Sequence, residues 1–122
     1  MSFQTYFASA GSGSRYEIMA SASRCGEDWS LTVCGGTAHH VGSVAAAWFA
    51  GGELNIRCIT LPGHRDDTAA RIFAENMARS LHSNVSVSAG IHIDSASRDE
   101  ITKLLDNCRV CCERLLDEIR NA

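Results

Sequence analysis

The stretch SVAAAWFAGGELNIRCITL, residues 43–61, consists of two apolar runs separated by Gly51 and Gly52. A glycine pair in this position is typical of a two-residue hairpin turn, because such a turn requires positive φ angles. A hairpin centred on this pair places Ala50 opposite Glu53 and fixes the register outward from there. The residues just beyond the two strands should therefore lie near each other at the open end of the hairpin.

The rest of the chain contains further strand-like and helix-like patterns. Period-two alternation predicts strands over residues 3–8, 15–23, 28–34 and 86–93, and helical spacing predicts helices over residues 66–81 and from residue 97 onward. Ser97 and Glu100 have the spacing of a capping box. Strand 86–93 is expected to run parallel to strand 53–61 through a helical crossover. Together these elements predict one α+β domain over residues 1–122, with a mostly antiparallel sheet and two helices packed on one face.

The composition indicates a globular protein. The 122 residues are 45 % hydrophobic and 20 % charged, and the net charge is −3. No basic cluster suits a phosphate backbone, so we expect no nucleic-acid partner. No apolar run approaches the roughly 18 residues of a membrane span, and no secretory signal pattern opens the chain, so we expect a cytoplasmic protein without a membrane partner.

The six cysteines are expected to be reduced thiols, since that is the default without a secretory signal. Cys108 and Cys111 form a CxxC pattern with Cys112 beside it, but the pattern lies in a strongly helical segment and no second CxxC completes a zinc site. We therefore predict that these thiols are buried and act as small apolar residues. A redox or metal role is the alternative.

Four of the five histidines are predicted to gather at the open end of the hairpin. Followed outward, the register places His39 opposite His64 and His40 opposite Gly63, and the crossover brings His92 to the same edge. The nearby carboxylates are those of Asp66, Asp67 and Asp94. Because imidazoles and carboxylates are common ligands of divalent metals, the sequence predicts a metal site here.

An anion is expected to bind beside the metal. Both predicted helices begin at this edge, and a helix N-terminus offers free N–H groups and the positive end of a dipole. Arg65 can add a forked contact with a phosphate. Simpler roles exist for some of these residues: Asp66 or Asp67 as a helix cap, Asp94 as a turn residue, and Gly63 as the residue that permits the bend.

Three segments resemble a known family. They are AHHVGSVAAA (38–47), LPGHRDDTAARIFAENMA (61–78) and SAGIHID (88–94). With these blocks in matching order, residues 15–118 resemble the small D-type accessory proteins of non-oxidative hydroxyarylic acid decarboxylases. This family is also described as prenylated-flavin chaperone-like, and its fold is related to that of proteasome-assembly chaperones.

The resemblance implies a protein that binds prenylated flavin mononucleotide (FMN) with a divalent metal near its phosphate and helps to load a partner decarboxylase. On the matching blocks it implies metal binding by His40, His64, His92 and Asp67, and phosphate binding by Arg65. We also expect cofactor binding by His39, which the hairpin register keeps in the neighbourhood, and by Gly63 and Asp66. The resemblance assigns no catalytic residue. This agrees with the lack of an obvious nucleophile or acid–base pair in the sequence.

Two other functions fit the same residues. A small metal-dependent hydrolase or lyase would activate a metal-bound water, with Asp66, Asp67 or Asp94 as the base. A structural metal site would instead make the protein an assembly or interaction module. Under each of these functions, exposed sheet edges predict a homo-oligomer.

Overall fold

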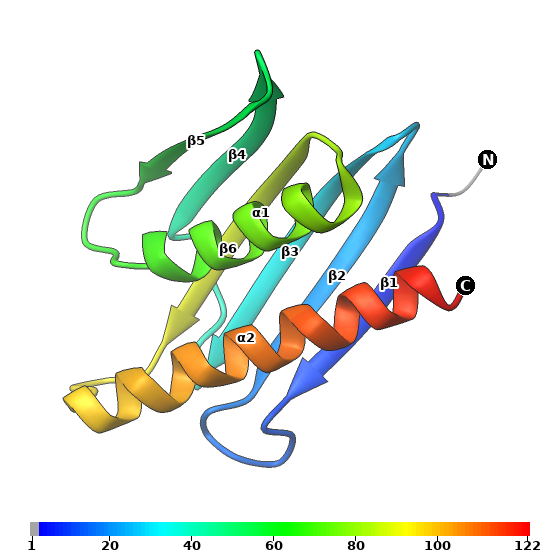
Figure 1. Cartoon of the computed structure of the whole chain (residues 1–122). Coiled ribbons are helices and arrows are strands. Elements are labelled where there is room, and N and C mark those ends of the chain that lie inside the picture. Colours follow the sequence, from blue (N-terminus) through cyan, green and yellow to red (C-terminus); the bar gives the residue numbers. More distant parts are fainter. Residues whose placement is uncertain (1–2) are drawn as a thin grey trace.

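The computed structural model describes residues 3–122. In chain order the elements are β1 (Thr5–Ala10), β2 (Ile18–Cys25), β3 (Asp28–Gly36), β4 (Ser43–Ala50), β5 (Glu53–Thr60), α1 (Asp67–Leu81), β6 (Val85–His92) and α2 (Arg98–Arg120). The six strands form one sheet with a single parallel pair (Figure 1). The predicted α+β class with a mostly antiparallel sheet is confirmed.

The sheet order is β1-β2-β3-β6-β4-β5. β6 pairs in parallel with β3 and antiparallel with β4. Since β4 is also antiparallel to β5, β6 has the same direction as β5, as the sequence predicted. The strands beside β6 were not predicted: β6 enters between β3 and β4, and it is the strand that joins the N-terminal part of the sheet to the β4–β5 hairpin.

The predicted hairpin register is confirmed over the whole of β4 and β5. The pairs run from Ala50 opposite Glu53 at the turn to Ser43 opposite Thr60 at the open end. Gly51 and Gly52 have φ angles of 61° and 80°, the left-handed region in which glycine carries no steric penalty. The turn chemistry therefore determines which side chains of both strands face the core.

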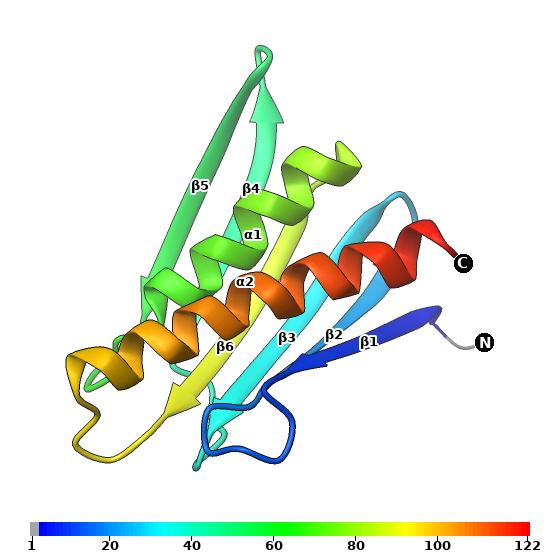
Figure 2. The same ribbon diagram turned by 60° about the horizontal axis from the view of Figure 1, so that its bottom comes forward.

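The helices cover different parts of the sheet. α1 packs against β4, β5 and β6, whereas α2 packs against β1 and β2 and also touches α1. Both helices lie in front of the sheet in two views related by a 60° rotation (Figures 1 and 2). The core between them and the sheet contains fully buried side chains such as Phe73, Met77, Val33, Val87 and Leu115.

α2 begins where the sequence predicted. The Ser97 side chain accepts a hydrogen bond from the Glu100 N–H, and the Glu100 carboxylate accepts one from the Ser97 N–H, each at 3.1 Å. This reciprocal pair is the predicted capping box and is confirmed. The backbone hydrogen bond from Ser97 lowers the pKa of Glu100, and a hydrogen bond from Tyr16 and an attraction to Arg15 add to this effect. The start of α2, next to the site described below, is thus fixed by local contacts.

The cysteines of α2 belong to the core. Cys108, Cys111 and Cys112 are at most 2 % exposed. Burial raises the pKa of Cys108 and Cys112 to about 12 and that of Cys111 to about 11. The prediction that these thiols are buried and act as small apolar residues is confirmed.

Alkylation is expected to distinguish these thiols from the exposed one. Iodoacetamide at pH 8 should modify Cys25, which is exposed, and leave Cys108, Cys111 and Cys112 unmodified until the protein is unfolded in guanidinium. The reason is that the thiolate is the reactive form, and burial disfavours both the thiolate and access to it. Peptide mass spectrometry of the native and unfolded samples measures this. Equal modification of Cys25 and the α2 thiols in the native sample would contradict it.

Neither helix within residues 3–122 is long and apolar enough to cross a membrane.

Candidate functional site

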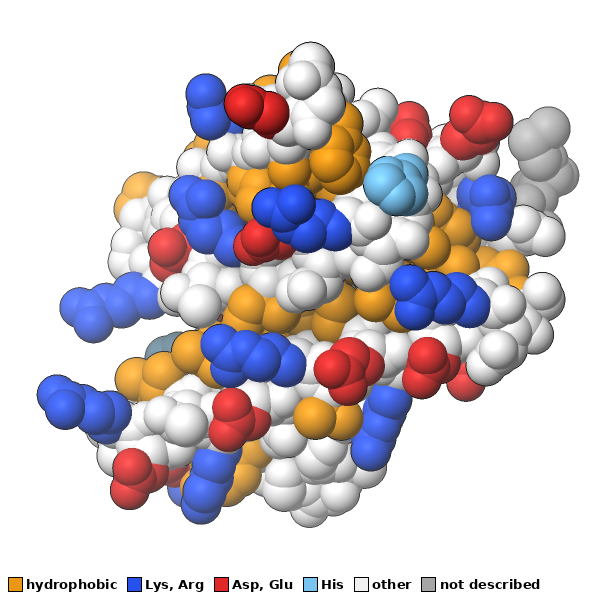
Figure 3. All heavy atoms as spheres, viewed as in Figure 1, with side chains coloured by type: hydrophobic (Ala, Val, Ile, Leu, Met, Phe, Trp, Pro, Cys, Tyr) orange, Lys and Arg blue, Asp and Glu red, His pale blue; other side chains and the backbone are white. Residues whose placement is uncertain are grey.

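A cavity of about 540 Å³ opens between the beginnings of the two helices. Its polar side contains His40, His64, Arg65, Asp66, Asp67 and His92, and its apolar side contains Ile91, Ile93, Ala96, Ile101, Leu104 and Leu105. The space-filling view shows a hollow between the two helices on this side, with basic side chains projecting from both of its borders (Figure 3). The cavity thus joins a polar wall to an apolar wall.

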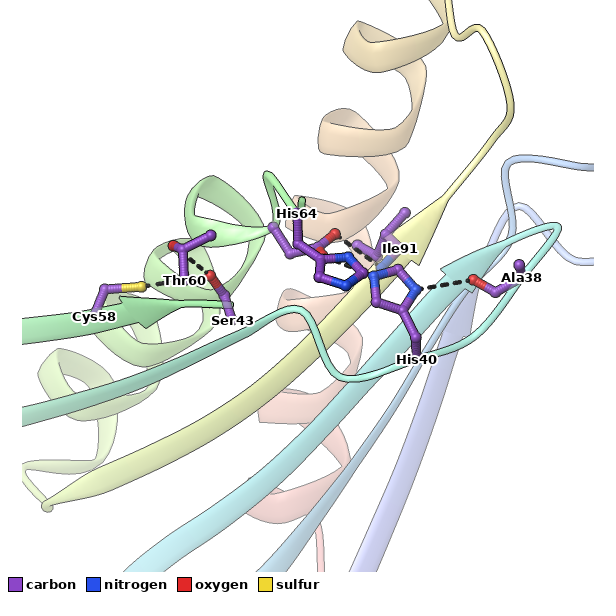
Figure 4. Close-up of polar contacts among 8 residues, drawn as sticks. Ala38, His40, Ser43, Cys58, Thr60, His64 and Ile91 are labelled. Carbon is purple, nitrogen blue, oxygen red and sulfur yellow. Dashed lines mark hydrogen bonds and ion pairs between the residues drawn. The ribbon is translucent and has the colours of Figure 1, made fainter. Parts of the chain in front are cut away.

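Three polar side chains meet at the bottom of the polar wall. His40 lies in the loop after β3, whereas His64 and Asp66 lie in the loop between β5 and α1. The two imidazole rings are stacked with their centroids 4.4 Å apart, and Figure 4 shows them side by side. Asp66 Oδ2 lies 2.9 Å from His40 Nε2 and 4.0 Å from His64 Nδ1. One donor atom from each residue lies within 4.8 Å of the other two, so the three could surround one ion.

Asp66 is held in place by the sheet rather than by the helix. It is only 6 % exposed, and its Oδ1 accepts a hydrogen bond of 2.9 Å from the Ile91 N–H of β6. It occupies the N-cap position of α1, but its side chain makes no capping hydrogen bond. The capping role considered for Asp66 is therefore wrong, and its carboxylate faces the two histidines instead. Asp67 is the first residue of α1 and lines the cavity outside this group of three.

Two glycines make room for this arrangement, and the sequence analysis missed both. A Cβ atom at Gly42 would overlap the Asp66 carboxylate, and one at Gly90 would overlap the His40 carbonyl oxygen. Gly90 lies within β6, and Gly42 directly precedes β4, with its N–H donating to the Ala89 carbonyl at 2.8 Å. A glycine inside a strand often marks a close approach of another backbone, and this was the available signal.

His92 lies at the rim of the cavity. Its ring centroid is 6.2 Å from that of His40, and its Nε2 is 2.7 Å from Asp94 Oδ1. Both side chains of this pair are exposed, with relative accessibilities of 49 % and 95 %. The structure therefore places His92 near the group formed by His40, His64 and Asp66 but not within it.

His39 lies apart from the other three histidines. It lines a shallow hollow with Met19, Thr32 and Cys34, whereas its neighbour His40 lines the cavity described above. The predicted convergence of four histidines thus holds for His40, His64 and His92. The strand pairing that would have set His39 opposite His64 ends earlier, since the last hairpin bond joins the Leu61 N–H to the Gly42 carbonyl at 2.8 Å.

The donor set fits a divalent metal ion. Two imidazoles and one carboxylate are typical ligands of Zn²⁺, and three protein ligands leave a coordination position open to a bound molecule. His40 Nδ1 lies 3.4 Å from the Ala38 carbonyl oxygen, and Nε2 lies 2.9 Å from Asp66 Oδ2 (Figure 4). With a metal ion bound, Nδ1–H would donate to Ala38 and Nε2 would coordinate the ion in place of its contact with Asp66. Such a bond from the second ring nitrogen commonly orients a metal-binding histidine.

Comparisons with known proteins agree with the fold and identify a family. The chain is similar to a chain in a solved structure described as a novel chaperone complex for yeast 20S proteasome assembly. The TM-score is 0.64 with 18 % sequence identity, and the match covers 99 % of this chain and 98 % of that one. At this identity the likeness shows the fold alone, and a search of curated proteins finds no match. The family model described as a prenylated flavin chaperone LpdD-like domain matches residues 12–120, nearly the whole chain, and the protein therefore belongs to this family of prenylated-flavin chaperone-like domains.

Proposed function

We propose that this protein is a non-catalytic accessory protein that binds prenylated FMN together with a divalent metal ion and helps to load a partner hydroxyarylic acid decarboxylase. One observation carries the proposal beyond the family: a metal-type donor set, a helix N-terminus and an apolar wall line the same cavity. A flavin mononucleotide has a phosphate at one end and a flat ring system at the other. A cavity with one polar and one apolar side matches such a ligand.

In this proposal His40, His64 and Asp66 hold the metal. The grouping of Asp66 with the two histidines favours it over Asp67, to which the sequence analysis had given this role. His92, paired with Asp94 at the rim, is within reach of the bound ligand rather than of the ion. The metal would supply positive charge to hold the phosphate in the cavity.

The phosphate is expected to bind at the beginning of α1. Asp67, Thr68 and Ala69 line the cavity, and their N–H groups belong to the first turn of the helix, where no preceding carbonyl is available within the helix. Arg65 also lines the cavity and can bind a phosphate through its guanidinium. Gly63 has a φ angle of 81° and lets the chain turn into this position. His39 lines the other hollow and not this cavity, so the cofactor-binding role predicted for it stays a prediction.

The ring system is expected to lie against α2. Ile101 is 48 % exposed at the cavity, whereas Leu104 and Cys108, which follow it at helical spacing along α2, are buried. Together with Leu105 and Ala96 it offers an apolar surface that a ligand can cover. The isoprenoid part of prenylated FMN adds apolar surface, and each buried CH₂ group contributes about 0.8 kcal/mol. The apolar wall therefore favours the prenylated flavin over FMN.

The same cavity offers no clear route to catalysis. Among the described residues that line it, the sole hydroxyl or thiol side chain is that of Thr68. The Asp66 carboxylate, a candidate base in the enzyme alternative, accepts a hydrogen bond from the Ile91 N–H and is a ligand of the metal in this proposal, so it would not be free to act as the base. We therefore assign binding and transfer to the protein, and the decarboxylation chemistry to its partner. All six cysteines are free thiols, which favours the cytoplasm as the compartment.

Titration with flavins tests this proposal. Wild-type protein should bind prenylated FMN more tightly than FMN, and only when Mn²⁺ or Zn²⁺ is present; His64→Ala should lose this binding. His82→Asn is the matched control, because His82 ends α1 with a φ angle of 49° that asparagine tolerates and does not line the cavity. Isothermal titration calorimetry measures the affinities.

The alternatives give different results in the same samples. No flavin binding under any metal condition would overturn the proposal. Unfolding on metal removal, seen by circular dichroism, would favour a structural metal site. Turnover of ester or phosphoester substrates that EDTA abolishes and metal restores would favour a hydrolase.

A further inference from the structure

Within residues 3–122, β5 has a neighbouring strand on one side only. It is the last strand of the sheet on its side, and two views show it at the margin of the molecule (Figures 1 and 2). Its eight residues pair with β4 without a bulge, and they include no proline or lysine. Bulges, prolines and lysines are common features that keep an edge strand from pairing with another chain. The outer edge of β5 is therefore open to the addition of a further strand.

The hydrogen-bond pattern shows which backbone groups point outward from β5. The Leu61 N–H donates to the Gly42 carbonyl at 2.8 Å, and bonded and non-bonded pairs alternate along an antiparallel ladder. Counted back from this pair in steps of two, the odd-numbered residues of β5 bond to β4. The N–H and C=O groups of Leu54 and Ile56 therefore point outward. The Ile56 carbonyl accepts a hydrogen bond from the Arg57 guanidinium at 3.2 Å, which is the contact of a carbonyl that faces away from β4.

The opposite edge of the sheet is covered by a helix. α2 packs against β1, and its Arg114 guanidinium donates to the Ser9 carbonyl at 2.9 Å. By the same alternation, the Ser9 carbonyl points outward from β1. At β5 the contact comes instead from the side chain of Arg57, a residue of the strand itself. That side chain is exposed, so it can turn away without any helix being displaced.

The sequence of the β5 edge is complementary to itself. Residues 53–57 read Glu-Leu-Asn-Ile-Arg. Setting Asn55 opposite the Asn55 of an antiparallel second copy places Glu53 opposite Arg57 twice. It also places Leu54 opposite Ile56 twice, so that the outward backbone groups of the two copies face each other as the ladder requires. Opposite charges and apolar side chains stabilise a strand pair when they lie directly across from each other. A register displaced by two or four residues loses both ion pairs.

We propose that β5 joins two copies of this protein edge to edge, in antiparallel register about a two-fold axis at Asn55. The two six-stranded sheets then continue as one, and the helices of both copies lie on the same face of it. None of residues 53–57 lines the cavity with His40 and His64, so the cavity stays open and the proposal does not depend on the proposed function. Only five residues of each copy pair directly, which is less than the standard interface of about 800 Å² per partner, so we expect a dissociation constant in roughly the micromolar range.

Charge reversal tests this register. At about 300 μM, well above a micromolar dissociation constant, the wild type is expected to sediment at twice the mass of Glu53→Arg and of Arg57→Glu. Each single variant sets like charges opposite each other twice. The variant that carries both changes restores the two ion pairs and should regain the wild-type mass. Arg98→Glu is the matched control and should keep the wild-type mass, because Arg98 is exposed at the start of α2, which packs against β1, β2 and α1. Analytical ultracentrifugation measures the masses.

A mixture of the two single variants gives the sharpest result. Each supplies the charge that the other lacks, so equal amounts of Glu53→Arg and Arg57→Glu should together reach the wild-type mass, although each alone does not. Amide exchange gives a second measurement: the N–H groups of Leu54 and Ile56 should exchange more slowly at about 300 μM than at about 10 μM, whereas that of Asn55, which bonds to β4, should not change.

Two results would overturn the proposal. One is a wild-type mass equal to that of both single variants at about 300 μM, which would show that β5 joins no second copy at this concentration. The other is a mixture of the single variants that stays at the lower mass, which would exclude this register. Glu53 and Arg57 are both exposed, so neither change disturbs the core. Circular dichroism verifies that each variant is folded.

Discussion

Asp66→Asn is expected to weaken the binding of Zn²⁺ or Mn²⁺ roughly 100-fold or more, since even losing a residue that only supports a metal ligand costs 10–100-fold. The variant removes the buried negative charge whose oxygen lies 2.9 Å from His40 Nε2 and 4.0 Å from His64 Nδ1. Asparagine keeps an oxygen that can accept the Ile91 N–H, so the sheet contact is retained. The loss should therefore appear in metal affinity, measured by calorimetry, and through it in the binding of prenylated FMN.

The matched control for this change is Asp67→Asn. Asp67 also lines the cavity, but it lies outside the group of three. Its substitution removes the same charge one residue further along the chain and is expected to change metal affinity less than about 3-fold, in the range of weakly coupled surface charges. If Asp67→Asn caused the larger loss, the metal would be held at the helix start rather than by Asp66.

Gly90→Ala is expected to have the largest effect on stability, about 3 kcal/mol, at the upper end of the usual cost of overpacking. The added methyl group would overlap the backbone carbonyl of His40, which has no flexible end that can move aside. The His40 loop must shift away from β6, so metal binding should fall together with the free energy of unfolding. Urea denaturation and metal titration of the same samples measure both losses.

Gly13→Ala provides the comparison. A Cβ atom at Gly13 meets nothing within 4 Å, and its φ angle is 81°. This substitution therefore carries only the backbone cost of a left-handed conformation, roughly 1–2 kcal/mol. Its metal affinity should be that of the wild type. Equal losses of metal binding in the two variants would show that the effect of Gly90→Ala is one of general stability rather than of the fit between β6 and the His40 loop.

Local sequence patterns predicted much of the fold. The Gly51-Gly52 turn determines the hairpin register because the turn geometry dictates each later pair. The capping box at Ser97 and Glu100 determines where α2 begins because its hydrogen bonds span only three residues. Both predictions rest on contacts between near neighbours in the chain. Such contacts leave a recognisable pattern of residue types.

The neighbours of β6 could not be predicted in the same way. The direction of β6 follows from the crossover. Its pairing with β3, however, joins residues that are far apart in the sequence, such as Trp29 and Val85. The alternation of apolar residues shows that a segment is a strand, but it does not show between which two strands of the sheet that segment lies. The insertion between β3 and β4 depends instead on the combined packing of all strands under the two helices.

At the site, the sequence predicted the right loops and not each residue's role. His40 and His64 were expected together and lie together. Whether His39 or His40 faces the cavity depends on where the strand pairing stops, and which of Asp66 and Asp67 faces the histidines depends on where α1 begins. In each case the two candidates are adjacent residues, so the prediction changes if a strand or helix ends one residue earlier or later. Sequence patterns do not locate the ends of strands and helices to within one residue.

The position of β6 has a consequence for the order in which the protein becomes functional. Before β6 is in place, β3 and β4 share no hydrogen bonds, and the Ile91 N–H that fixes Asp66 is missing. A chain emerging from the ribosome can already form the β1–β3 meander and the β4–β5 hairpin, yet His40 has no fixed position relative to Asp66. Under the proposed function, we therefore expect cofactor capture to begin only once the last third of the chain has been synthesised and folded. On this expectation an incomplete copy would not hold the flavin.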